Sequence, residues 1–161
     1  LVSPVPPLFV ILSKAVPYFL LSILNLTTIL LLSVFVLHVP IAGSLTALSG
    51  VSLLFIFVSL SLGLLISCVT RTQVAALLIS AMLLMMPTIL LSGMIFPVES
   101  MPLILQGFSC LIPARWYISV VRKLMIEGVP FACVWQETCI LFLMGTILIG
   151  ITTRKFKNRL E

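Results

Sequence analysis

Charged side chains are scarce in this sequence. Asp, Glu, Lys and Arg together make up 8% of its 161 residues, whereas hydrophobic residues make up 61%. Soluble domains carry about a quarter charged residues, because they need polar groups to cover their surface. A mean hydropathy of +1.36 therefore indicates a protein whose solvent is the lipid bilayer.

The side chains that most catalytic sites need are also few. The sequence has no Asp, which excludes an aspartyl intramembrane protease. Its single His is His38, so a Ser–His hydrolase would have to use a residue beside a predicted turn. It contains no glycine-rich phosphate loop, no His-Glu-x-x-His and no Cys-x-x-Cys. The four cysteines lack metal-ligand spacing, although Cys110 and Cys133 could pair in a disulfide. We therefore expect no metal site, no bound cofactor and no bond chemistry in this chain.

Long uncharged segments predict membrane-spanning helices. No Asp, Glu, Lys or Arg occurs in the 56 residues between Lys14 and Arg71, or in the 27 residues between Arg71 and Glu99. Since one crossing takes about 20 apolar residues, the first segment holds two helices and the second holds one. With a further apolar segment near the C-terminus, they predict an all-α integral membrane fold with four crossings, over about residues 15–37, 45–69, 74–96 and 134–153.

The basic residues predict how these helices are oriented. Lys and Arg are enriched on the cytoplasmic side of membrane proteins. If the basic tail (residues 154–161) is cytoplasmic, four crossings put the N-terminus on the same side, with six basic residues inside and three outside. The inner set is Lys14, Arg71, Arg154, Lys155, Lys157 and Arg159, and the outer set is Arg115, Arg122 and Lys123. No basic patch alternates with exposed aromatic residues, so we expect no nucleic-acid partner.

The segment between the third and fourth crossings predicts an outer helical hairpin, over residues 98–128. Pro102 marks the start of one short apolar helix and Pro113 its end. In the following segment Trp116 and Tyr117 belong to an apolar face, which is typical of a helix lying at the membrane interface. A solvated face on an external loop is the alternative. The opposite polar face is formed by Arg115, Ser119, Arg122, Lys123 and Glu127, and Gly128 follows it.

Small residues predict a close helix contact in the second crossing. Ser59, Gly63 and Ser67 recur every four residues, with Ser52 on the same stripe. Helices in lipid associate where small side chains let the backbones approach. In the first crossing Asn25 is the most polar residue and should face protein or a water-filled path. Ordinary helix–helix packing is the alternative explanation for the small residues of the second crossing and for the polar residue of the first.

The third crossing contains residues that break helices. Pro87 removes one backbone donor and frees the carbonyl of Leu83. Ser92, Gly93 and Pro97 follow before the outer end. Broken helices persist in membranes where protein or a water cavity satisfies the freed groups, so this pattern indicates a gate or translocation path. A proline kink without function is the alternative. The same crossing holds Met82, Met85, Met86 and Met94, which suit either an adaptable ligand surface or contact with lipid.

Four motifs in this chain resemble those of ABC type-2 permeases. Residues 90–97 (LLSGMIFP) with 99–102 (ESMP) are similar to the outer end of the family's fifth helix, and residues 112–117 (IPARWY), with Arg122 and Glu127–Gly128, to its external hairpin. Residues 1–5 with Lys14 resemble the segment after the cytosolic coupling helix, and residues 70–75 the inner turn before the fifth helix. The motifs follow the family's order along nearly the whole chain.

The resemblance implies that the chain holds the third to sixth crossings of a six-crossing permease, with residues 1–14 as the cytosolic end of the coupling segment. It implies an exporter in a bacterial-type inner membrane, built with a second permease subunit and a separate ATP-binding cassette ATPase that uses the ATP. The substrate would be a drug, lipid or polymer. Pro87, Ser92 and Gly93 would then belong to the gate, and the residues near the ATPase would be Ser3, Pro4, Lys14 and Arg71. A passive channel or scaffold, and less so a membrane enzyme, are the alternatives.

Overall fold

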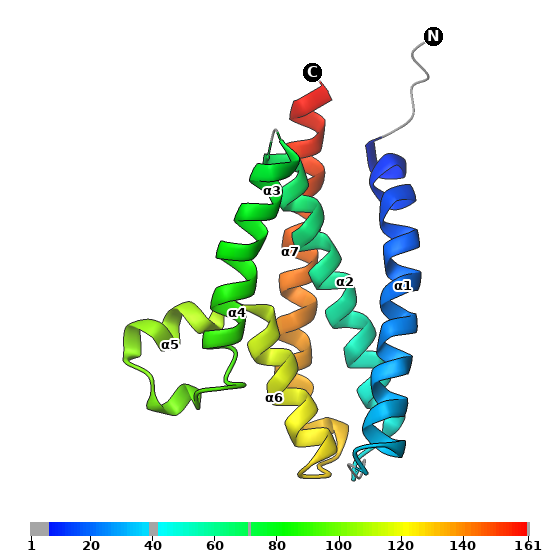
Figure 1. Cartoon of the computed structure of the whole chain (residues 1–161), viewed down its shortest axis with the longest axis vertical. Helices are drawn as coiled ribbons and strands as arrows, with labels where there is room; N and C mark the ends of the chain where they lie inside the picture. The colour runs from blue at the N-terminus through cyan, green and yellow to red at the C-terminus, as the bar shows by residue number, and fades with distance from the viewer. Residues whose placement is uncertain (1–6, 39–41, 71, 161) are drawn as a thin grey trace.

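The computed structural model describes residues 7–38, 42–70 and 72–160, which form an all-helical bundle (Figure 1). The first residues of α1 and the last of α7 lie at the same end of this bundle. The helices are α1 (Pro7–Phe35), α2 (Leu45–Val69), α3 (Gln73–Ile79), α4 (Met86–Leu91), α5 (Leu103–Cys110), α6 (Pro113–Met125) and α7 (Trp135–Leu160). A π-helix, η1 (Ser80–Met85), joins α3 to α4, and two 3₁₀ turns are η2 (Val98–Ser100) and η3 (Phe131–Cys133).

Four helical segments among the described residues are long and apolar enough to cross a membrane, in agreement with the predicted number. They become five if α5 and α6, which meet at 89°, count as one broken span. The second predicted crossing coincides with α2. The others differ at their ends: the four segments are Ser13–Phe35, Leu45–Val69, Gln73–Leu91 and Trp135–Lys155. Lys14, expected before the first crossing, lies inside α1, and the basic tail extends α7 as helix to Leu160.

The core of the bundle lies where α2, α6 and α7 meet. Leu48 and Val51 of α2 pack against Leu124 of α6 and Leu141 of α7, and all are buried. A fully buried Leu contributes about 1.5–3 kcal/mol relative to an exposed one. These contacts therefore fix one end of α7 against α2 and α6, while α1 and α3 leave most of their apolar side chains exposed.

The apolar face of helix α6, predicted to lie at the membrane interface, packs against protein. The helix runs beside α2 and α7 (Figure 1). Tyr117 stacks on Phe55 with the ring centroids 4.3 Å apart, and its hydroxyl shares a 2.9 Å hydrogen bond with Ser52. The apolar face of α6 thus completes the protein core. Pro113, predicted to end the short apolar helix, is instead the first residue of α6, because α5 already ends at Cys110.

The third crossing is shorter than predicted and is wound in two ways. Met86 donates its backbone N–H to Ala81, five residues earlier, so the turn before Pro87 is a π turn. The wider turn moves carbonyl groups away from the proline ring, whose residue has no N–H to donate. The helix then ends at Leu91 instead of Phe96, because the chain turns at Gly93.

Candidate functional site

A polar pocket of about 360 Å³ lies between the segment after α4 and the polar face of α6. It brings together two groups of residues that the sequence singled out separately. From the predicted gate come Ser92, Gly93 and Pro97, and from the predicted hairpin come Arg115, Arg122 and Glu127. The remaining lining residues are Val98, Glu99, Gln106, Ile118, Ser119 and Lys123.

Gly93 shapes one wall of this pocket. Its φ of +82° is a left-handed conformation that follows the last turn of α4, so it ends the helix rather than weakening it. Ser92 is buried beside it, and the turned backbone presents the Gly93 carbonyl to Arg122 Nη2 at 3.4 Å. A Cβ at this position would stand 3.0 Å from Val98 Cγ2. Alanine at this position would therefore be strained by the backbone conformation and would press on Val98.

Arg115 holds α5 and α6 at their sharp angle. Its Nη1 donates to the backbone carbonyl of Gln106 at 2.9 Å and to the hydroxyl of buried Ser109. The neighbouring Trp116 donates its indole N–H to the carbonyl of Cys110 at 3.0 Å. Carbonyl groups at a helix C-terminus carry partial negative charge, which a guanidinium group stabilises. Arg115 and Trp116 thus form hydrogen bonds that join the two helices of the hairpin.

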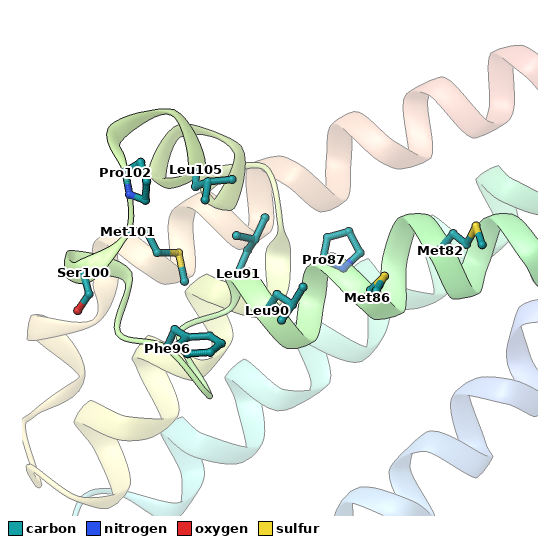
Figure 2. A pocket seen from close by; sticks show the side chains of 10 residues that line it. All are labelled: Met82, Met86, Pro87, Leu90, Leu91, Phe96, Ser100, Met101, Pro102 and Leu105. Atoms are coloured by element: carbon teal, nitrogen blue, oxygen red, sulfur yellow. The ribbon is translucent and has the colours of Figure 1, made fainter.

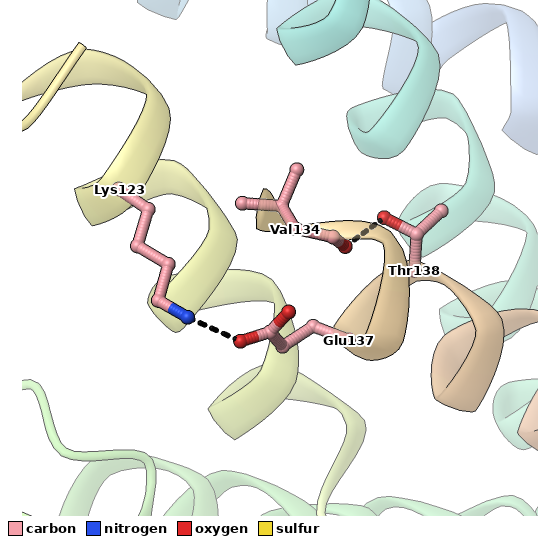
Figure 3. Close-up of polar contacts among 4 residues, drawn as sticks. All are labelled: Lys123, Val134, Glu137 and Thr138. Atoms are coloured by element: carbon pink, nitrogen blue, oxygen red, sulfur yellow. Dashed lines mark hydrogen bonds and ion pairs between the residues drawn. The ribbon is translucent and has the colours of Figure 1, made fainter. Parts of the chain in front are cut away.

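A salt bridge joins the other end of α6 to α7 (Figure 3). Lys123 Nζ lies 2.6 Å from Glu137 Oε1; the Lys side chain is 34% exposed and that of Glu137 is 12% exposed. The hydrogen bond to Glu137 raises the pKa of Lys123 above its ordinary value, so the ammonium is charged at neutral pH. The second oxygen of Glu137 is buried and has no hydrogen-bond partner within the described part of the chain.

An apolar pocket of about 490 Å³ lies next to the same segment (Figure 2). Met82, Met86 and Pro87 line it from the helix, and Phe96 and Met101 face them from the loop. Pro102, predicted to begin the short helix, caps α5 and lines this pocket. Two of the four clustered methionines therefore surround a cavity that could accept an apolar group.

Several predicted residues stay apart from these pockets. Asn25 lies exposed on α1, and Lys14 lies in the N-terminal part of the same helix. An added Cβ at Gly63 would meet nothing within 4 Å, so no described helix of this chain packs closely against the stripe at that position. Its partner remains a prediction. Ser3, Pro4 and Arg71 lie outside the described residues.

The cysteines and other ligand-type residues form no cluster in the described structure. None of the four cysteines forms a disulfide within the described structure, so Cys110 and Cys133 do not pair. Among the described residues, no group of three His, Cys, Asp or Glu side chains could hold a metal ion. The walls of the two pockets offer hydrogen bonds, charge and apolar surface.

Glu137 and Gly43 were not among the residues singled out from the sequence, whereas Gly128 was. Glu137 forms the salt bridge that joins α7 to Lys123 of α6. Gly43 and Gly128 form close backbone contacts: a Cβ on Gly43 would stand 2.5 Å from the Leu124 carbonyl oxygen, and one on Gly128 2.9 Å from the Cβ of Ala42. Their positions beside predicted turns were the available signal.

Comparison with known proteins identifies the family. A profile described as "ABC-2 family transporter protein" matches residues 1–154. The chain is 38% identical over 154 residues to the "Probable multidrug ABC transporter permease YbhS" of Escherichia coli, covering 94% of this chain and 40% of that protein. It is 32% identical to YbhR of the same organism, described in the same words, covering 85% and 37%, and 27% identical to its "Inner membrane transport permease YhhJ", covering 98% and 42%.

The chain spans about two fifths of the length of these relatives. No solved structure gives a significant match. Permeases of ABC transporters do not hydrolyse ATP themselves, so the absence of a phosphate loop from the sequence agrees with a transport role. The resemblance noted in the sequence is thus confirmed by a match over nearly its full length: the chain is a multi-pass membrane protein and belongs to the ABC-2 family of transporter permeases.

Proposed function

We propose that this chain is the C-terminal membrane part of a permease subunit in an ATP-driven exporter of drug-like compounds. The relatives YbhS and YbhR are both named probable multidrug ABC transporter permeases, which supports this substrate class over a polymer. Two permeases of one organism that both resemble the chain also favour a second permease subunit as partner. A separate ATP-binding cassette ATPase would supply the energy, at the end that carries Ser3, Pro4, Lys14 and Arg71, and YhhJ supports placing the assembly in an inner membrane.

One observation carries the mechanism: the broken third crossing ends at a polar pocket shared with the outer hairpin. Pro87 and the π turn interrupt the helix, and Ser92, Gly93 and Pro97 then line the pocket with Arg115 and Arg122. ATP-driven closure of the ATPases would tilt the inner ends of these helices as rigid bodies. The outer segment would then open at its break and release substrate past the hairpin.

Replacement of Pro87 tests this role. In Pro87→Ala the missing N–H returns and the ring that disturbs the preceding turn is removed, so the helix should stiffen. We expect efflux of a fluorescent cationic dye from cells to fall several-fold. Membrane insertion and co-purification of the ATPase should persist. The matched control is Pro17→Ala, which removes the interior proline of α1 and should leave efflux unchanged.

Each outcome of this experiment has a meaning. Normal efflux by Pro87→Ala would reduce the break to a kink without function. Loss of insertion would assign it to folding. Dye efflux that continues in cells without the ATPase would instead point to a passive channel.

The proposed sidedness places both termini in the cytoplasm, which follows from the excess of Lys and Arg there. A single cysteine introduced at Arg154, in a cysteine-free background, should resist an impermeant thiol reagent in intact cells. A cysteine at Glu127 should react with the same reagent. Labelling in the reverse pattern would overturn the orientation.

A further inference from the structure

The segment that follows α4 separates two pockets of opposite character. We call residues 92–106 the strap. One side of the strap lines the apolar pocket through Phe96, Met101 and Leu105 (Figure 2). The other side lines the polar pocket through Pro97, Glu99 and Gln106. Residues next to each other in sequence thus belong to different pockets, and a molecule lying across the strap would meet both.

The polar pocket holds charges of both signs that take part in no salt bridge among the described residues. Among the described residues, Lys123–Glu137 is the single salt bridge with an N···O distance within 4.0 Å. Arg122 is exposed, and its hydrogen bond to the Gly93 carbonyl is long at 3.4 Å. Glu99 and Glu127 are exposed on the same pocket and take part in no salt bridge.

The apolar pocket is suited to hydrocarbon. Its volume of about 490 Å³ falls within the range of small-molecule sites, about 300–1,000 Å³. Met82 and Met86 are 73% and 63% exposed, and α5 exposes Leu103 and Ile104 nearby. Flexible thioether side chains adapt to a chain without fixed shape.

We propose that the strap binds a zwitterionic phospholipid with a phosphoethanolamine headgroup. The phosphate binds the Arg122 guanidinium, the ammonium binds the carboxylates of Glu99 and Glu127, and an acyl chain lies in the apolar pocket. An anionic headgroup would engage Arg122 but would leave both carboxylates without a partner, whereas a zwitterionic headgroup pairs with charges of both signs. Choline headgroups are disfavoured because a trimethylated ammonium has no N–H to donate.

This lipid is a bound component of the hairpin and not the exported substrate. Its headgroup lies beside Gly93 and Arg122, where the broken crossing meets α6. Bound there, it would supply counter-charges to the polar pocket in the resting protein. The inference therefore needs only the membrane location of the chain, and it can hold or fail independently of the transport proposal.

Lipid retention by the purified permease tests the site. The permease is reconstituted in vesicles with equal amounts of dioleoyl phosphatidylethanolamine, phosphatidylcholine and phosphatidylglycerol, then extracted in mild detergent, and the retained lipids are quantified by mass spectrometry. We expect phosphatidylethanolamine to be enriched over both other lipids. Arg122→Gln should lower that enrichment about fivefold, as for the loss of one charge-assisted contact. The control Arg154→Gln, at the other end of the bundle, should not change it.

A second variant keeps the test independent of the charges. Met86→Trp should fill the apolar pocket and lower the total lipid retained, and its side chain is exposed enough to be replaced without disturbing the core. Equal retention of the three lipids would overturn the proposal. So would preferential retention of phosphatidylglycerol, or enrichment that survives Arg122→Gln in protein with an unchanged melting temperature.

Discussion

Gly43 offers a sharp test of how the turn between α1 and α2 is held against α6. It lies in the turn between α1 and α2, directly against the last turn of α6. A Cβ on Gly43 would stand 2.5 Å from the Leu124 carbonyl oxygen and 3.3 Å from its carbonyl carbon. Beside this contact the backbone N–H of Ala42 donates to the Met125 carbonyl at 3.3 Å. Gly43→Ala therefore forces two backbone segments apart.

The size of the effect follows from what can move. Leu124 is fully buried among α2 and α7, so the carbonyl cannot retreat without disturbing the core. Overpacking of this kind costs about 1–3 kcal/mol. Loss of the neighbouring backbone hydrogen bond adds about 1 kcal/mol. Gly43→Ala should thus lower the free energy of unfolding by about 2–4 kcal/mol, even though the substitution adds a single methyl group.

Gly50 is the matched control, because a Cβ there meets nothing within 4 Å inside α2. Gly50→Ala should raise helix stability by about 0.5–1 kcal/mol, since alanine is the better helix former. Both variants are compared with the unmodified protein by thermal and SDS-induced unfolding in detergent micelles. A Gly43→Ala protein as stable as the Gly50→Ala protein would show that the turn does not dock on α6 as described.

Three further outcomes are expected. Lys123→Met should lower the free energy of unfolding by about 1–2 kcal/mol more than Glu137→Gln, because it leaves the more buried partner, the Glu137 carboxylate, without a counter-charge. Equal losses in the two variants would contradict this. Because the pKa of Lys123 is raised above its ordinary 10.5, stability from this pair should be constant from neutral pH to about pH 9 and be lost only as the pH rises through the folded-state pKa, as monitored by melting temperature. Gly63→Leu should reduce the assembly to smaller particles in size-exclusion chromatography with no loss of insertion, whereas Gly150→Leu, on an equally open site of α7, should not; no change in either variant would mean that the stripe faces lipid.

The crossings were predictable because hydrophobic length is a local property. The limits of α2 follow from the turn residues at its N-terminal side and the polar residues after Val69. The break near Pro87 and the hairpin were likewise readable, since proline and the spacing of Arg115, Arg122 and Glu127 act locally. In each case the sequence needed to decide the structure lies within a single segment of the chain.

What could not be predicted depends on partners far along the chain. The amphipathic pattern of α6 predicts that one face is apolar, but such a face can pack against either lipid or protein. Only the meeting of Tyr117 with Phe55 and Ser52 of α2 decides for protein. The same holds for Lys123 and Glu137, which belong to different helices, and for Gly93, whose left-handed φ depends on the course of the strap.

The π turn between α3 and α4 has a consequence for how this sequence can change in length. A π turn accommodates one residue more than an α turn, and each residue of a helix rotates the following faces by about 100°. Deleting one residue within Ser80–Met85 should therefore convert the segment to a regular α-helix, while the side chains of Pro87 and Thr88 stay on the same face of the crossing. A deletion within Gln73–Ile79 would instead rotate every later side chain of the crossing away from its neighbours. Tolerance to shortening should consequently be concentrated in six residues of this helix, and deletion variants scored for insertion and efflux would locate it.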